Sequence, residues 1–78
     1  MNFHKIFWPG DIKVQRILRT GDTPGLITIL GYPDQDIQRK SSDRLAEIGE
    51  PAVPFLIKSL KHRSVSVRLG AVEALGAI

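Results

Sequence analysis

The feature that most restricts the fold of this chain is an internal repeat with a period of 30 residues. When the sequence is moved along itself by that interval, apolar residues and prolines coincide, whereas most polar residues do not. A chain in which packing positions recur is expected to build the same supersecondary unit in each period. The coinciding pairs are Pro24 and Pro54, Leu26 and Leu56, Ile27 and Ile57, Leu30 and Leu60, Ile37 and Val67, Leu45 and Leu75, and Ile48 and Ile78.

The second period predicts two helices joined by a short turn. Pro51 can lie in the first turn of a helix, because an N–H at that position has no partner within the helix. Ser64 follows the turn and is the expected N-cap of the second helix. Each helix has one apolar stripe. The two stripes are Val53, Leu56, Ile57 and Leu60, and then Val67, Ala71, Ala74, Leu75 and Ile78.

The first complete period predicts the same pair of helices. Thr23 is the expected N-cap of its first helix, with Pro24 at the first helical position. Asp34 or Asp36 is expected to cap the second helix, and Gly49 to end it. Upstream lies an incomplete unit, residues 11–21, whose inward-facing positions are Val14, Ile17 and Leu18.

These residues resemble a known repeat family. The segment 67–78 is similar to the second helix of short HEAT-like repeats, and the segment 50–57 is similar to the first. The period looks like that of the variety named after phycocyanobilin lyase subunits. The resemblance covers residues 11–78. It is weaker in the first complete period, where Gln38 and Arg44 replace the arginine and the small residue found one period later.

The resemblance implies an all-α fold, a right-handed α-solenoid of about two and a half helical-hairpin repeats. We expect a cap at 1–10, a partial repeat at 11–21, and repeats at 22–49 and 50–78. Most members of the class look like binding scaffolds, and lyase activity belongs to a minority. The repeat pattern carries no catalytic residue, so we predict no catalytic, cofactor-binding or metal-binding residue in this chain.

The two ends of the chain predict different surroundings. A solenoid end needs a polar outer face, but the last helix presents an apolar edge. We therefore expect further repeats beyond Ile78. The apolar N-terminal segment is expected to fold over the first helix as a cap. The residues concerned are Val72, Leu75 and Ile78 at one end, and Phe3, Ile6, Phe7 and Trp8 at the other.

Composition narrows the function classes. Cysteine is absent, which excludes disulfides and thiolate metal sites. The two histidines, His4 and His62, are not at a metal-ligand spacing. No apolar run approaches the length of a membrane span. The net charge of +3 fits a cytoplasmic protein as well as a nucleic-acid binder.

The outward face of the second helices is the predicted binding surface. It is mixed in sign and lacks the interleaved aromatic residues on which bases stack. Leu69 is an exposed apolar residue there. Another protein is therefore a better predicted partner than a nucleic acid. The candidate partner-binding residues are Arg39, Asp43, Leu69 and Glu73.

Two other sets of charged residues have structural and functional interpretations. Arg68 lies at the edge of the core stripe, where an ion pair with Asp36 or Asp43 of the preceding unit is favoured over a ligand contact. Lys58, Lys61, His62 and Arg63 fit a helix C-terminus and turn. Two alternative functions stay open. One is a bilin lyase-like enzyme with its catalytic residues beyond Ile78, and the other is a nucleic-acid binder that uses Lys58, Lys61, Arg63 and Arg68 on phosphates.

Overall fold

The structure is a computed structural model that describes the backbone of residues 9–78 and the side chains of residues 12–78. The predicted N-terminal cap residues Phe3, Ile6, Phe7 and Trp8 lie outside this part. All regular structure between residues 9 and 78 is helical. The elements are α2 (Pro9–Thr20), α3 (Thr23–Ile29), α4 (Gln35–Ile48), the short 3₁₀ helix η1 (Glu50–Ala52), α5 (Val53–Ser59) and α6 (Val65–Ala77).

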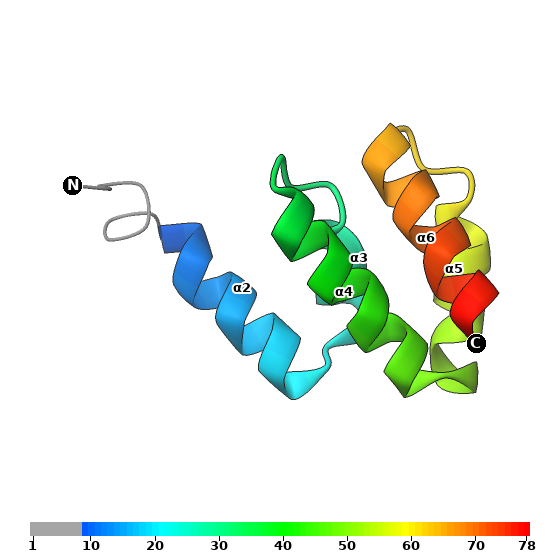
Figure 1. Cartoon of the computed structure of the whole chain (residues 1–78), viewed down its shortest axis with the longest axis horizontal. Helices are drawn as coiled ribbons and strands as arrows, with labels where there is room; N and C mark the ends of the chain where they lie inside the picture. The colour runs from blue at the N-terminus through cyan, green and yellow to red at the C-terminus, as the bar shows by residue number, and fades with distance from the viewer. Residues whose placement is uncertain (1–8) are drawn as a thin grey trace.

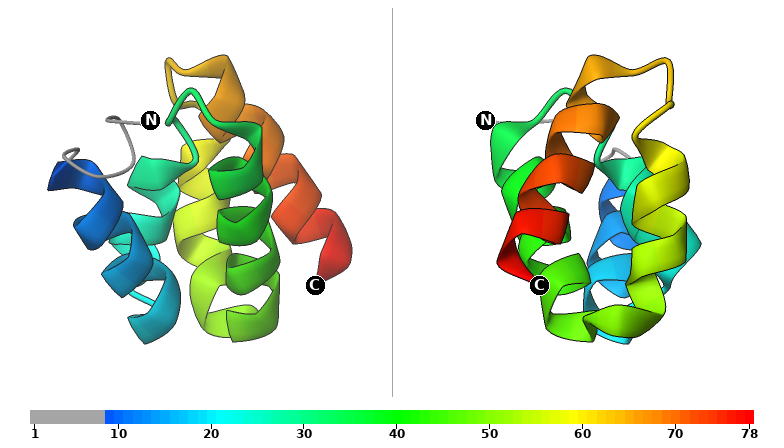
Figure 2. Two further views of the ribbon diagram at one scale, coloured as in Figure 1. Left: turned by 60° about the vertical axis from the view of Figure 1, so that its left-hand side comes forward. Right: turned by 90° about the vertical axis from the view of Figure 1, so that its right-hand side faces the viewer.

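The helices form two successive antiparallel pairs that pack side by side. Helices α3 and α4 make the first pair, and α5 and α6 make the second (Figure 1). In that view α4 and α6 lie in front of α3 and α5, and α2 lies beside the first pair. Figure 2 shows the second pair from the side that faces away from α2. Helix α4 therefore has a neighbour on each side, α2 and α6.

Helix starts follow the predicted capping chemistry in two of three cases. The Asp34 carboxylate accepts hydrogen bonds from the N–H groups of Asp36 (2.9 Å) and Ile37 (3.2 Å). The Ser64 hydroxyl accepts one from the N–H of Val67 (3.3 Å). The prediction of Thr23 as an N-cap was wrong, because the extended residue is Asp22 and Thr23 is already helical.

The end of α4 and the start of the second pair differ slightly from expectation. Gly49 ends α4 as predicted, with a φ of +76° that favours glycine. Pro51 lies in η1, and α5 begins only at Val53. The proline thus occupies a short 3₁₀ turn rather than the first turn of the α-helix.

Some positions one period apart have similar surroundings in the core. Leu26 and Leu56 are both completely buried, and Leu45 is buried where Leu75 is partly covered. Several residues depart from the predicted stripes: Ile29 and Ala52 are buried, whereas Ile57, Leu60 and Ile78 are exposed. The buried apolar residues are Val14, Leu26, Ile29, Leu30, Leu45, Ala52, Leu56, Val67, Ala71 and Ala74.

The second pair is held on the first at Gly70 of α6. A Cβ added to Gly70 would lie 2.5 Å from Leu30 Cδ2, so any larger residue would force this leucine to shift. The Ser42 hydroxyl donates a hydrogen bond to the Gly70 carbonyl (3.2 Å). One period later, the residues equivalent to Leu30 and Ser42 are Leu60, 38% exposed, and Val72, 56% exposed. The matching surface of the second pair is therefore left exposed by the described part of the chain.

Because Leu30 is buried and Leu60 is partly exposed, the same substitution at these two equivalent positions should change the stability by different amounts. Leu30→Ala leaves a cavity between the two pairs and should lower the free energy of unfolding by about 2–5 kcal/mol. Leu60→Ala removes side-chain atoms that are partly in solvent and should cost less than about 1 kcal/mol. Urea unfolding followed by circular dichroism measures both. Equal losses would show that Leu30 does not join the two pairs.

Candidate functional site

A groove runs between α4 and α6 on the face turned toward the viewer in Figure 1. Its position follows from the contact of Ser42 with Gly70, which brings the two helices together below it. The groove is lined by Gln35, Gln38, Arg39, Ser66, Leu69, Gly70 and Glu73.

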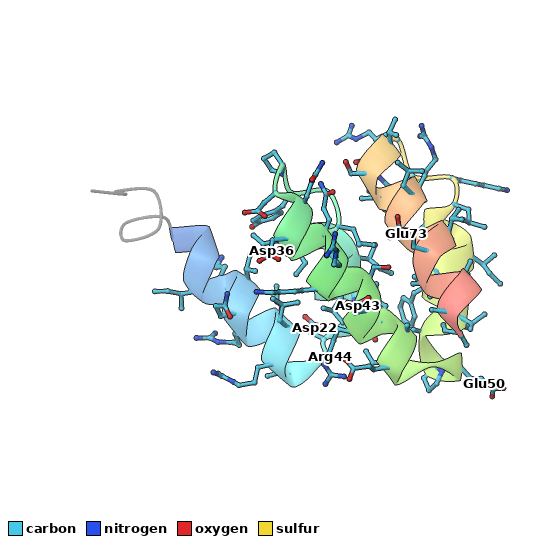
Figure 3. The ribbon with its side chains drawn as sticks, in the orientation of Figure 1. Asp22, Asp36, Asp43, Arg44, Glu50 and Glu73 are labelled. Atoms are coloured by element: carbon cyan, nitrogen blue, oxygen red, sulfur yellow. The ribbon has the colours of Figure 1, made fainter. Side chains whose placement is uncertain are left out.

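Three of the four predicted partner-binding residues meet in this groove. Arg39 comes from α4, and Leu69 and Glu73 come from α6. Asp43 is also on α4 but lines the neighbouring groove, between α2 and α4. Figure 3 shows Asp43 on α4 and Glu73 on α6, the two helices nearest the viewer. Their role in binding stays a prediction.

The chemistry of the α4–α6 groove combines an apolar wall with hydrogen-bonding groups and opposite charges. Leu69 is 58% exposed and supplies the apolar wall. The Gln38 amide donates to the Tyr32 carbonyl (2.5 Å), which fixes that side chain on the turn between α3 and α4. Arg39 and Glu73 lie on opposite walls.

The groove between α2 and α4 is organised by Arg44, a residue that the repeat pattern marked only as a departure from its neighbour unit. Its Nε donates to the Leu18 carbonyl in the last turn of α2 (3.1 Å). Carbonyls in the last turn of a helix lack partners within the helix and attract cations. The guanidinium lies against Gly21, whose φ is +73° and whose missing Cβ makes room for it. Arg44 thus attaches α2 to the first pair (Figure 3).

The predicted ion pair between Arg68 and an acidic residue of the preceding unit is not formed in the described part of the chain. Arg68 Nη1 donates to the His62 carbonyl (2.6 Å) in the turn of its own helical pair. Asp36 forms an ion pair with Lys40 one turn along α4 (3.1 Å). Both residues have a nearer local partner, and such local contacts require less ordering of long side chains than an ion pair between units.

The remaining predicted charges lie elsewhere. Lys58 and His62 line a third groove, between α3 and α5, on the side away from the α4–α6 groove (Figure 1). Lys61 and Arg63 are exposed in the adjoining turn. Over residues 12–78 no group of three or more His, Cys, Asp or Glu side chains is placed to hold a metal ion. The helices between residues 9 and 78 are too short or too polar to cross a bilayer.

Together these features define an all-helical protein of packed antiparallel pairs. The HEAT repeat family model matches residues 23–78, which include both complete helical pairs. The chain therefore belongs to the HEAT repeat family. A search of curated proteins found no match, and neither did a search of solved structures.

The contact of Arg44 with α2 predicts a local loss of stability when it is removed. Arg44→Met keeps the aliphatic stem but loses the hydrogen bond to Leu18, and should cost about 1 kcal/mol. Amide hydrogen exchange in α2 should accelerate more than exchange in α6. Arg39→Met, on an exposed side chain of the same helix, is the control and should change stability by less than about 0.5 kcal/mol. Equal effects of the two variants on α2 exchange would contradict the role given to Arg44.

Proposed function

We propose that this chain is a protein-binding scaffold and that its α4–α6 groove binds a segment of another protein. The observation that carries the proposal is the meeting of Arg39, Leu69 and Glu73 around one groove. HEAT repeats commonly mediate protein–protein interaction, which agrees with this function. We assign the repeats to the short type named after phycocyanobilin lyase subunits, because of their 30-residue period.

The shape and chemistry of the groove suit a peptide segment. The exposed Leu69 can contact an apolar side chain of the partner, and burial of such contacts supplies most binding energy at protein interfaces. Gln35 offers an amide that can both donate to and accept from an extended backbone. Arg39 and Glu73 can pair with opposite charges and so set the orientation of the segment.

The outer face of the second pair supports the placement of the chain in a right-handed α-solenoid. Leu60 and Val72 repeat the positions of Leu30 and Ser42, which are covered by α6. Exposed apolar patches of this kind mark interaction sites. We propose that another helical pair of the same type covers Leu60 and Val72 in the assembled protein.

A nucleic-acid partner for the α4–α6 groove is disfavoured by its charges. Binding to a phosphate backbone requires a coherent set of lysines and arginines. Here Arg39 is balanced by Glu73 across the groove. Arg68, which follows Val67 on α6, does not line the groove and donates to the His62 carbonyl. The surface therefore lacks a continuous positive track.

The proposal is tested by selecting peptides from a random display library against the full chain. Nuclear magnetic resonance of the labelled chain then maps the binding site of each selected peptide. We expect the shifted amide signals to cluster at residues 35–39 and 66–73. Leu69→Asp places a charge against the apolar part of the peptide and should weaken binding at least about tenfold.

Ile57→Asp is the matched control, because Ile57 is a similarly exposed apolar residue on α5 and does not line the groove. It should leave the affinity of these peptides within about twofold. The proposal fails if no selected peptide shifts residues 35–39 and 66–73. It also fails if Leu69→Asp and Ile57→Asp have the same effect.

A further inference from the structure

The third groove, between α3 and α5, differs in character from the α4–α6 groove. It lies on the other side of the molecule, where α3 and α5 form the back of the two pairs in Figure 1. Phe55 is 44% exposed in it, although it is one of the largest apolar side chains in the described part of the chain. The groove is lined by Pro24, Ile27, Phe55, Lys58, Ser59 and His62.

The floor of this groove offers little hydrogen bonding. Ser59 is almost fully buried, and its hydroxyl donates to the Phe55 carbonyl within α5 (2.7 Å). The imidazole Nδ1 of His62 accepts from the N–H of Ser64 (3.0 Å). Pro24, Ile27 and Phe55 contribute apolar surface. A bound group is therefore held on this floor by apolar contact rather than by directional bonds.

Basic residues are concentrated around the end of α5. Lys58 lines the groove, and Lys61 and Arg63 are exposed in the turn that follows α5. The acidic residues of the equivalent turn in the first pair already interact with other groups of that pair. Asp34 caps α4, and Asp36 pairs with Lys40. Across residues 12–78 no carboxylate forms an ion pair with any of these three cations.

We propose that the α3–α5 groove binds an acidic amphipathic segment of a partner protein. An aliphatic or aromatic side chain of the segment would pack between Ile27 and Phe55. Its flanking carboxylates would pair with Lys58 and with the cations of the turn. The positive charges of Lys58, Lys61 and Arg63 favour a negatively charged segment. The apolar floor favours a segment with an apolar side chain that can be buried there.

A peptide accounts for both halves of this surface better than a nucleic acid does. Phosphates would use Lys58, Lys61 and Arg63 but gain nothing from the apolar floor. Stacking of successive bases needs several exposed aromatic side chains. The groove offers one, Phe55. Because no residue of this groove lines the α4–α6 groove, the inference does not depend on the proposed function.

The experiment is a fluorescence polarisation titration of the full chain with synthetic labelled peptides. Each peptide carries one Leu, Phe or Trp between pairs of Asp and Glu residues. At least one of the three should bind, and its affinity should fall as salt rises. Phe55→Ser and Lys58→Glu should each weaken binding about tenfold or more. Ile12→Ser, at an exposed apolar residue of α2 that lines none of the three grooves, should leave the affinity unchanged.

Three outcomes would overturn the inference. The first is that none of the acidic peptides binds. The second is that peptides with lysine in place of the acidic residues, or glycine in place of the anchor, bind equally well. The third is that a single-stranded oligonucleotide binds more tightly than any peptide and is sensitive to Lys58→Glu but not to Phe55→Ser. Lys58→Glu changes an exposed side chain, so its effect does not depend on whether Phe55→Ser folds fully.

Discussion

The approach of α6 to the first helical pair at Gly70 is the contact on which the rest of this structure depends. The absent side chain lets Leu30 pack against the backbone of α6, and the Ser42 hydroxyl reaches the Gly70 carbonyl. This contact sets how far apart α4 and α6 lie. It therefore sets the floor of the groove in which Arg39 and Glu73 face each other. The same packing places α5 beside α3 and so creates the α3–α5 groove on the other side of the molecule.

The repeat predicted the helices and most of the core, because it recorded which positions are apolar. Burial of apolar side chains is the main force that drives folding. The spacing of apolar residues along each helix indicates which face of that helix is buried. Leu26 and Leu56 were correctly paired in this way. The pattern missed Ile29 because the residue one period later is the polar Ser59, although both are buried. The placement of Arg39, Leu69 and Glu73 at one groove was accessible from the sequence, because it needed only the outward face of consecutive helices.

Polar contacts were predicted less well than apolar ones. Caps within a few residues, such as Asp34 and Ser64, follow from local spacing. The bond from Arg44 to Leu18 joins residues 26 positions apart, and no periodic signal marks it. A long cation where the next unit has Ala74 was the only sign of it. Arg68 shows the opposite error: a residue with a plausible distant partner used a carbonyl of its own turn.

The exchange of Ser42 for Val72 one period later has a mechanical consequence. A hydrogen bond has a preferred direction, so the bond from Ser42 to Gly70 locks α6 at one height along α4. Apolar attraction depends on area and hardly on direction. A neighbour seated against Val72 would be held without such a lock, so it could slide and tilt on the second pair. Successive joints of the stack would then differ in stiffness, with the joint between the two pairs seen here the more rigid.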